Sequence, residues 1–352
     1  MDSRIIKIIE YAIMAPSGDN CQPWRFSVTG KQINLYNIPE RDTSLYNLHQ
    51  RASLVSHGAV LENIEICAPS FGLTADIRLL PDQTDPNLIA TALLTECPTK
   101  NHELLDTISK RHTNREAYSS VEISNTQRKK LMTLGTQDGQ EVWLSQTTAE
   151  RKSLAKLLSY NERLVFEIHE LHQFLFEHLR WTDEEAIKTG DGLDIKTLGL
   201  NSIDKYAFNF LKNWQFVNLL NKVGFSKIIE FKGRQLLNTA SSVAILSITG
   251  SEPKDYVQGG QLWQRFLLHL AKEGLTAHPV AGLAFLLQSV KEGSLKNHLN
   301  NSQLQRLNAI LNDLQQMTNS NDSTLLSMFR IGQGAEVTRA LRKPVECFIV
   351  NH

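Results

Sequence analysis

The sequence predicts an α+β fold, an α/β sandwich built from two related halves. Segments with the three-to-four-residue spacing of amphipathic helices alternate with short apolar runs typical of strands along the 352 residues. An internal repeat is also present: Gly58 and Gly72 are 14 residues apart, as are Gly260 and Gly274, and the second glycine of each pair begins the tetrapeptide Gly-Leu-Thr-Ala. An apolar helix that feeds the same glycine-terminated turn twice indicates a duplicated unit.

The first hundred residues contain one short helix, a hairpin and one long helix. Isoleucines recur with helical spacing through residues 3–15, and Pro16 and Gly18 end that helix. The long helix is expected to end at Gly72, which suits the left-handed position after a helix. The predicted elements after the first helix are a hairpin at 24–37, with its turn at Thr29-Gly30-Lys31, a helix at 53–73 and a strand at 74–81.

The rest of the chain repeats this alternation around an irregular segment. Residues 181–235 are rich in glycine, asparagine and aromatic residues and have weaker periodicity, so we expect an insertion of short helices that forms a lid. The other predicted helices are at 101–118, 124–135, 149–180, 259–275 and 302–317, and the predicted strands are at 140–147, 239–250, 324–334 and 345–351.

The composition as a whole gives no indication of a highly charged partner or of an oxidising compartment. Lys and Arg total 37, as do Asp and Glu, so the formal net charge of zero predicts neither a nucleic-acid nor a membrane partner. The four cysteines form no CxxC pair, which fits a reducing compartment. The apolar run at 241–248 is far too short to span a bilayer, and no signal peptide is apparent, so we expect a cytoplasmic protein.

Two basic segments are candidate phosphate-binding sites. Residues 110–115 combine Arg111, Arg115 and Lys110 with a histidine and a threonine hydroxyl, which is a donor set that suits a phosphate dianion, although a solvated charged turn is the alternative. Arg339 and Arg342 follow the last long strand and are further candidates. The Gly332-x-Gly334 pair beside them is not a dinucleotide fingerprint, because Val337 stands where the third glycine would be.

Other reactive residue types carry weaker signals. His169, His172 and His178 lie on one predicted helix without the spacing of a known metal motif, so a charged helix face is preferred to a metal site. Cys21 has Arg25 nearby, but a packed structural cysteine is preferred to a reactive thiolate.

Four motifs together resemble the FMN-dependent nitroreductases. The segment APSGDNCQPWRF at 15–26 resembles their A-P-S-x-x-N-x-Q-P-W-x-F signature, and RHTNR at 111–115 resembles their flavin-phosphate motif. EGLTAHP at 273–279 resembles their Gly-Leu turn beside the flavin ring, and residues 330–344 resemble their C-terminal phosphate-binding segment. The resemblance covers most of the chain except 150–238, and it is closest to the single-chain, two-domain group that includes the dormancy-linked mycobacterial nitroreductase-like proteins.

The resemblance implies a fused pseudo-dimer with one complete flavin site. Ordinary members are homodimers in which one subunit supplies the phosphate clamp and the other the Pro-Ser-Asn loop, whereas here the loop precedes the basic motif in one chain. The implied halves are residues 1–98 and 99–352, each with an antiparallel-type sheet and a long interface helix, and the second contains the insertion at about 181–235. The implied flavin-binding residues are Pro16, Ser17, Asn20, Gln22, Arg111, His112, Thr113, Arg115, Gly274, Leu275, Arg339 and Arg342.

The function implied by this resemblance is an FMN-dependent NAD(P)H oxidoreductase with one FMN per chain. Hydride would pass from NAD(P)H to flavin N5 and then to an electron-poor acceptor such as a nitroaromatic or quinone, with no catalytic side chain required and no metal. The alternative is an FMN-sequestering protein whose lid blocks the flavin, and an unrelated scaffold or interaction protein is a third possibility. The expected partners are small molecules, and the chain is expected to act as a monomeric pseudo-dimer that is open to further dimerisation.

Overall fold

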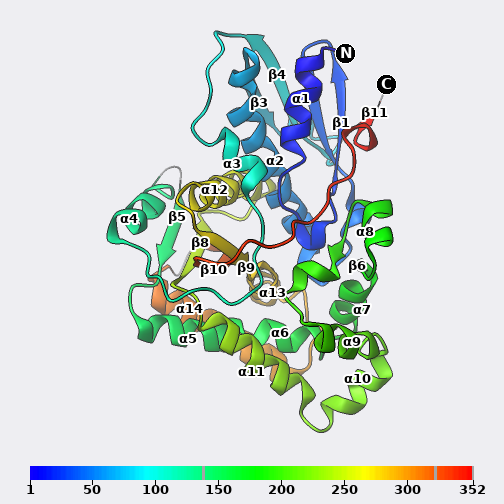
Figure 1. Cartoon of the computed structure of the whole chain (residues 1–352), viewed down its shortest axis with the longest axis vertical. Coiled ribbons are helices and arrows are strands. Elements are labelled where there is room, and N and C mark those ends of the chain that lie inside the picture. The colour runs from blue at the N-terminus through cyan, green and yellow to red at the C-terminus, as the bar shows by residue number, and fades with distance from the viewer. Residues whose placement is uncertain (137–138, 321–322, 351–352) are drawn as a thin grey trace.

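Two sheets and the helices around them form the framework of the molecule (Figure 1). The computed structural model describes residues 1–136, 139–320 and 323–350. The first sheet has the strand order β11-β1-β2-β4-β3, and its neighbours are antiparallel except for β1 and β11. Its strands are β1 (Trp24–Thr29), β2 (Gln32–Asn37), β3 (Leu73–Leu79), β4 (Leu88–Glu96) and β11 (Ile349–Val350). The predicted α+β class is therefore confirmed as a mixture of helices and mainly antiparallel sheets.

The N-terminal elements agree closely with their sequence patterns. Thr29 pairs with Gln32, which places the hairpin turn at the predicted glycine. The first two helices are α1 (Ser3–Ala12) and α2 (Arg51–Cys67), and Gly72 adopts a φ of 70° after a short 3-10 turn. Strand β4 was not predicted, because its buried positions do not alternate regularly with exposed ones.

The second sheet has the strand order β5-β8-β10-β9 and is antiparallel throughout. Its strands are β5 (Gln140–Leu144), β8 (Ser242–Ile248), β9 (Thr276–Pro279) and β10 (Thr324–Gly332). Every residue of β8 and β10 is buried, which explains why both strands appear in the sequence as continuous apolar runs. The helices that accompany this sheet are α3 (Leu105–Lys110), α4 (Asn125–Thr133), α12 (Pro253–Lys272), α13 (Ala281–Lys291) and α14 (Asn301–Thr318).

The single helix predicted at 149–180 is wrong, because three helices occupy this range. They are α5 (Thr148–Leu158), α6 (Tyr160–Val165) and α7 (His169–His178). The second break falls at Phe166, whose carbonyl accepts a hydrogen bond of 2.5 Å from Asn221 Nδ2. Because the carbonyl bonds a side chain from a distant segment, the apolar periodicity alone could not show that the helix ends here.

The predicted insertion of short helices is present, and its later helices lie at the pole opposite both chain termini (Figure 1). A small parallel ribbon, β6 with β7, stands at its beginning. The elements are β6 (Leu179–Arg180), α8 (Asp183–Thr189), β7 (Leu193–Asp194), α9 (Ser202–Phe210), α10 (Trp214–Asn221) and α11 (Phe225–Leu237). Within the described residues, no helix is long and apolar enough to cross a bilayer.

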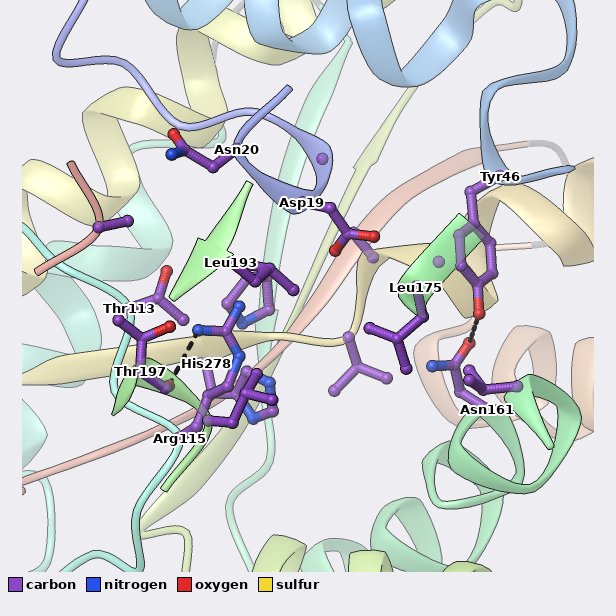
Figure 2. A pocket seen from close by; sticks show the side chains of 18 of the residues that line it. Asp19, Asn20, Tyr46, Thr113, Arg115, Asn161, Leu175, Leu193, Thr197 and His278 are labelled. Carbon is purple, nitrogen blue, oxygen red and sulfur yellow. Dashed lines mark hydrogen bonds between the residues drawn. The ribbon is translucent and has the colours of Figure 1, made fainter. Parts of the chain in front are cut away.

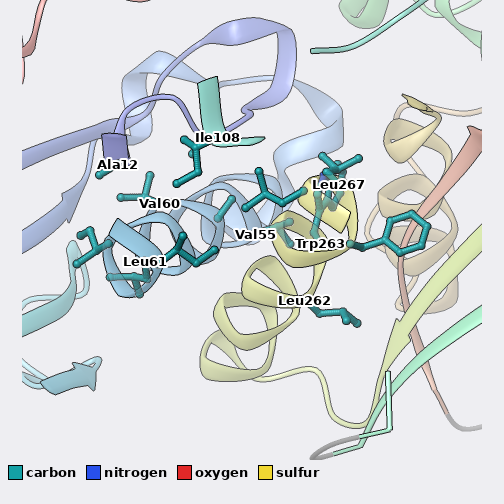
Figure 3. Close-up of a cluster of buried hydrophobic side chains, with 14 of the residues drawn as sticks. Ala12, Val55, Val60, Leu61, Ile108, Leu262, Trp263 and Leu267 are labelled. Carbon is teal, nitrogen blue, oxygen red and sulfur yellow. The ribbon is translucent and has the colours of Figure 1, made fainter. Parts of the chain in front are cut away.

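Helices α2 and α12 cross at the centre of the molecule, where their apolar side chains form a shared core (Figure 3). The two repeat glycines meet at this crossing. A Cβ added to Gly58 would lie 1.9 Å from the carbonyl oxygen of Val257, and one added to Gly260 would lie 2.0 Å from that of Val55. Each contact therefore has a counterpart in which the same positions of the two helices exchange roles.

Polar pairs on the two helices repeat this reciprocity. Arg265 Nε lies 2.8 Å from Glu62 Oε1, and Gln264 Nε2 donates to Asn63 Oδ1 at 2.7 Å. Gly274 ends α12 with a φ of 70°, as Gly72 does in the first half. A strand follows each of these glycines, β3 after Gly72 and β9 after Gly274.

The C-terminal segment leaves the second sheet and adds a strand to the first. After β10 the chain runs as an extended segment toward β1 (Figure 1), where Phe26 pairs with Ile349 in parallel. The predicted strand at 345–351 is shorter in the structure, because Val345–Cys347 form a 3-10 turn. Its last predicted residue, 351, lies outside the described residues.

Candidate functional site

A cavity of about 660 Å³ contains most of the residues that the sequence singled out. Its walls come from the loop after α1, the basic loop after α3, the C-terminal segment and the helical insertion. Figure 2 shows Asp19 above Arg115 and His278, whereas the Tyr46 hydroxyl is directed at Asn161. Segments nearly 100 residues apart in the sequence therefore contribute to one site.

The loop after α1 is held in an unusual backbone conformation. Asp19, Asn20 and Gln22 all have positive φ, at 41°, 57° and 51°. Ser17 Oγ accepts a hydrogen bond of 2.9 Å from the Gln22 amide, which closes the loop. Pro16, Ser17 and Asn20 line the cavity.

Two amide side chains connect this loop to residues 190–192 and to the C-terminal segment. Asn20 Nδ2 donates to the carbonyls of Leu341, at 2.9 Å, and Gly192, at 3.1 Å. Gln22 donates to the carbonyl of Gly190 at 2.9 Å, and its Oε1 accepts from the Lys343 amide at 3.2 Å. Gln22 is buried and does not line the cavity, so its contacts hold the loop in place.

Arg342 holds the same loop in place through hydrogen bonds. Its guanidinium donates to Asn20 Oδ1 at 2.8 Å and to the carbonyls of Ala15, at 3.0 Å, and Ile13, at 3.1 Å. Burial, together with the charge of Arg111, lowers its pKa to about 9. Although Arg342 borders the cavity, its donors are directed mainly at protein carbonyls, and it orients the loop.

Arg111 is the least satisfied charged group in the cavity. The residue is only 9% exposed, and its Nε is buried without a hydrogen-bond partner. Burial, and secondly the charge of Arg339, lowers its pKa to about 10. Arg339 also lines the cavity and donates to the carbonyl of Ser109. Among the residues that the structure describes, neither arginine has an acidic partner, so this end of the cavity carries uncompensated positive charge.

The rest of the basic loop lies along the same wall. Thr113 forms an isolated bridge with Ala277, and the Asn114 amide donates to the Ala277 carbonyl at 3.1 Å. Arg115 Nη1 donates to the Thr197 carbonyl at 3.3 Å, a contact drawn in Figure 2. His112 Nδ1 lies 3.0 Å from the Lys110 carbonyl oxygen. His112, Thr113 and Arg115 all line the cavity.

The predicted Gly274 and Leu275 do not line the cavity. Gly274 ends α12, and the strand that follows, β9, carries His278 and Pro279 to the cavity instead. The motif therefore contributes residues three to five positions later than expected, because the turn at the glycine is needed to reverse the chain before the strand can reach the wall.

Sequence reasoning missed Arg330, a fully buried arginine on β10 that lines the cavity. Its Nε donates to His278 Nδ1 at 3.4 Å, its Nη2 donates to the Asn114 carbonyl at 3.2 Å, and its guanidinium lies 4.0 Å above the Tyr118 ring. Burial and the charges of Arg115 and Arg330 hold the pKa of His278 well below its usual range. A lone charge within an apolar strand pattern was the available signal.

The missed carboxyl groups are Asp19 and Glu162. Burial is the main cause of the raised pKa of each, while the charge of Arg115 opposes that effect at both. Figure 2 shows the Asp19 carboxylate directed toward the centre of the cavity. Next to Glu162, Asn161 accepts a hydrogen bond of 3.3 Å from Tyr46, which links α6 to the first half. Neither carboxyl group occupies a fixed position of the motifs, so no sequence signal indicated them.

The helical insertion and the two helices before it supply an apolar wall. Side chains that share this wall come from α6 to α11 and the turns between them: Phe166, Phe174, Leu175, Leu193, Phe208 and Phe225. The cavity is consequently polarised, with uncompensated arginines at one part of its lining and aliphatic and aromatic groups at another. Such an arrangement suits an amphipathic ligand that carries an anionic group.

The weaker candidates do not form sites of their own. Burial raises the pKa of the Cys21 thiol, which makes it a poor nucleophile. His172 is buried, with its Nε2 2.7 Å from the Leu211 carbonyl oxygen and its ring against Phe176 and Trp214. Within the described part of the chain, no cluster of three His, Cys, Asp or Glu side chains could hold a metal ion.

Comparison of the sequence with curated proteins finds mycobacterial relatives. An uncharacterized protein of Mycobacterium tuberculosis is 23% identical over 275 residues, which cover 78% of this chain and 38% of the relative. Two proteins of the same species that are provisionally named NAD(P)H nitroreductases are 28% and 29% identical, over 32% and 30% of this chain and 33% of each relative. The matches thus span between a third and two fifths of these relatives' length. No protein-family model matches the chain.

Comparison with solved structures finds flavoproteins at low similarity. The FMN-dependent nitroreductase NfnB of Mycobacterium smegmatis, solved with NADPH, is 14% identical, covers 66% of this chain and 92% of its own, and has a TM-score of 0.36. A BluB-like flavoprotein of Clostridium difficile is also 14% identical, covers 72% of this chain and 100% of its own, and has a TM-score of 0.38. The sequence motifs and the curated relatives together show that this chain resembles the nitroreductase-like proteins.

Proposed function

We propose that this chain is an FMN-binding oxidoreductase of the nitroreductase type, which uses NAD(P)H and holds one FMN in the polarised cavity. The observation that carries the proposal is the buried, unpartnered Nε of Arg111 beside Arg339, because neither arginine has an acidic partner among the described residues. A buried charge without a partner is costly, so such a cluster indicates a site for an anion. The resemblance of the motifs to those of nitroreductases then favours the phosphate of FMN.

The donor set fits a phosphate dianion. Arg111 and Arg339 would neutralise its charge, and Arg115 and the Thr113 hydroxyl lie on the same wall to complete the set. His112 borders this part as well, whereas Arg342 acts through the loop that it orients. Burial is the main cause of the lowered pKa values of Arg111 and Arg342, and the charge of a neighbouring arginine is the second; the phosphate would offset that repulsion.

The remaining walls suit a flat ring with one polar edge. Pro16 and Ser17 present the backbone of the strained loop, while the apolar wall excludes water from the opposite side. When bound, FMN supplies two-electron chemistry between NAD(P)H and an electron-poor acceptor such as a nitroaromatic or quinone. The protein side chains bind and orient, so we assign none of them as an essential acid or base.

The chain is also proposed to be a duplicated unit that folds as a pseudo-dimer, with halves at about 1–98 and 99–352. The reciprocal contacts of Gly58 and Gly260 support this, because a two-fold interface pairs residue i with j and j with i. The pairs Glu62–Arg265 and Asn63–Gln264 are related by the same exchange. In this view, the C-terminal strand β11 is an arm of the second half that completes the sheet of the first.

A second candidate function is FMN sequestration with little turnover. It is favoured by the insertion, because side chains from residues 165–237 form a whole wall of the cavity. If that wall covers the reactive face of the ring, nicotinamide could not stack against it.

Anaerobic addition of NADPH to the flavin-loaded protein separates the two candidates. Rapid bleaching of the flavin band supports the oxidoreductase. A flavin colour that neither NADPH nor NADH changes would contradict turnover and support sequestration. A purified protein that neither carries nor takes up FMN would contradict both.

A further inference from the structure

Helices α9, α10 and α11 expose an unusual number of large apolar side chains. Seven lie between residues 206 and 231, and they include Val223, which is 82% exposed, and Leu219, which is 59% exposed. The full set is Tyr206, Phe210, Phe216, Leu219, Val223, Ile228 and Phe231. Large apolar groups gathered on a surface commonly mark a site of interaction with a protein or a membrane.

These residues occupy one face of each helix. Tyr206 and Phe210 are four residues apart on α9, and their ring centroids are 5.3 Å apart. Phe216 and Leu219 are three apart on α10, and Ile228 and Phe231 are three apart on α11. The inward faces carry Phe208, Leu211, Phe225 and Ile229, which line the cavity. Helices α9 and α11 are therefore apolar on two faces, and α10 buries Val217 opposite its exposed apolar residues, so packing within the chain accounts for only one apolar face.

The same helices carry local positive charge that the neutral chain as a whole conceals. Residues 202–237 contain six Lys or Arg and two Asp or Glu, a net charge of +4. One of the two acids, Glu230, pairs with Arg163 at 3.4 Å, and the other, Asp204, lines the cavity. Among the described residues, Lys222 and Lys227 form no ion pair, are exposed and do not line the cavity, whereas Lys232 borders it.

The location of the patch is suited to contact with a flat surface. The loop between α10 and α11, which contains Lys222 and Val223, lies at the pole opposite both termini (Figure 1). The acidic first turn of α8, with Asp183, Glu184 and Glu185, lies away from that pole. Exposed apolar groups flanked by unpaired lysines at a protruding end are typical of helices that lie in a membrane interface.

We propose that helices α9–α11 dock on the surface of an anionic lipid bilayer, with Phe216, Leu219 and Val223 entering the interface and the lysines contacting lipid phosphates. This contact is peripheral and needs no spanning helix. A second copy of the chain fits the patch less well, because two identical +4 surfaces would face each other. The docking does not depend on the flavin, so the apoprotein and the FMN-loaded protein should dock alike.

Flotation of the full chain with vesicles tests this proposal. The protein should float with vesicles of phosphatidylcholine that contain phosphatidylglycerol, and raised salt or pure phosphatidylcholine should weaken this binding. Lys222→Glu with Lys227→Glu should lower partitioning by about 25-fold or more, since each lysine near an anionic surface contributes about fivefold. The matched control, Lys129→Glu with Lys254→Glu, changes the net charge equally at exposed positions outside the patch and should leave partitioning unchanged.

The apolar part of the patch is tested with Phe216→Ser combined with Val223→Ser. This pair should abolish flotation, whereas Ile187→Ser, at a 72% exposed position on α8, should not. Thermal unfolding and FMN content monitor the folding of each variant. Absence of flotation with anionic vesicles, or equal losses in the patch and control variants, would overturn the proposal. A dimer that Phe216→Ser and Val223→Ser dissociate, without vesicle binding, would also overturn it and identify a self-association surface.

Discussion

At the scale of single residues, Arg111 shows most clearly that part of the cavity lining carries unpaired positive charge. Its buried Nε has no partner, and a neighbouring arginine, Arg339, helps to lower its pKa to about 10. A protein bears that cost where a ligand supplies the missing negative charge. Arg342 was also predicted to bind the phosphate, but its guanidinium instead donates hydrogen bonds to Asn20 Oδ1 and to the carbonyls of Ala15 and Ile13.

Arg111→Ala should weaken FMN binding by about 10- to 100-fold, because it removes charge-assisted hydrogen bonds to the phosphate. Binding of riboflavin, which lacks the phosphate, should change little. Fluorescence titration with both flavins measures the two affinities. The control is Arg78→Ala, at an exposed position on β3 outside the cavity. Equal losses for FMN and riboflavin would show that Arg111 does not bind the phosphate.

His57 in α2 should make stability depend on pH. The side chain is fully buried, and burial lowers its pKa to about 4 from 6.5. The unfolded chain therefore binds this proton more readily between pH 6.5 and 4, and the free energy of unfolding should fall by about 3 kcal/mol as the pH drops through that range.

Denaturant unfolding of the wild type and His57→Leu across this pH range checks the effect. The pKa of Asp42 is raised to about 6 by burial, so its contribution changes in the opposite direction. For that reason the difference between the two proteins, rather than the wild-type curve, isolates His57. If the two pH profiles are parallel, the ring is not held neutral in the native state.

At the scale of elements, the crossing of α2 and α12 depends on two glycines. Their Cα atoms allow the helix backbones to approach so closely that an added Cβ would lie about 2 Å from a carbonyl oxygen of the opposite helix. Backbone cannot rotate away as a flexible side chain can.

Gly58→Ala and Gly260→Ala should each lower the free energy of unfolding by about 3 kcal/mol or more, because the methyl group forces the helices apart. Gly233→Ala on α11 is the control, since its nearest neighbour is a Glu162 side-chain carbon, and it should cost less. Chemical unfolding measures all three. Similar, small decreases in the free energy of unfolding for all three variants would show that α2 and α12 can move apart at little cost.

Most helices and strands could be predicted from local patterns, whereas elements determined by distant contacts could not. The hairpin, α2 and the apolar strands β8 and β10 follow their periodicity and their turn residues. The break at Phe166 depends on Asn221, and the pairing of β11 depends on a strand more than 300 residues earlier. Such tertiary contacts leave no local signal.

The candidate site shows the same division. Nine of the twelve residues that the motifs single out as flavin-binding line the cavity, among them Ser17, Arg111 and Arg115. Gln22, Gly274 and Leu275 lie outside its lining, because the first anchors a loop and the other two form a turn. Asp19, Glu162 and Arg330 were missed, since a cavity-facing side chain outside a motif is recognisable only once the chain is folded.

At the scale of the whole molecule, the central claim is that two halves of one chain build a single complete FMN site. The loop after α1 and the basic loop after α3 come from different halves, and each occurs only once in the sequence. A symmetric pair of subunits would have two such sites, whereas the proposed fused pair would have one.

Titration of the apoprotein with FMN, followed by calorimetry, tests this claim most directly because it counts sites. We expect saturable binding of one FMN per chain. Riboflavin should bind more weakly, because it has no phosphate to accept hydrogen bonds from the arginines. Two FMN per chain, or no saturable binding at all, would contradict it.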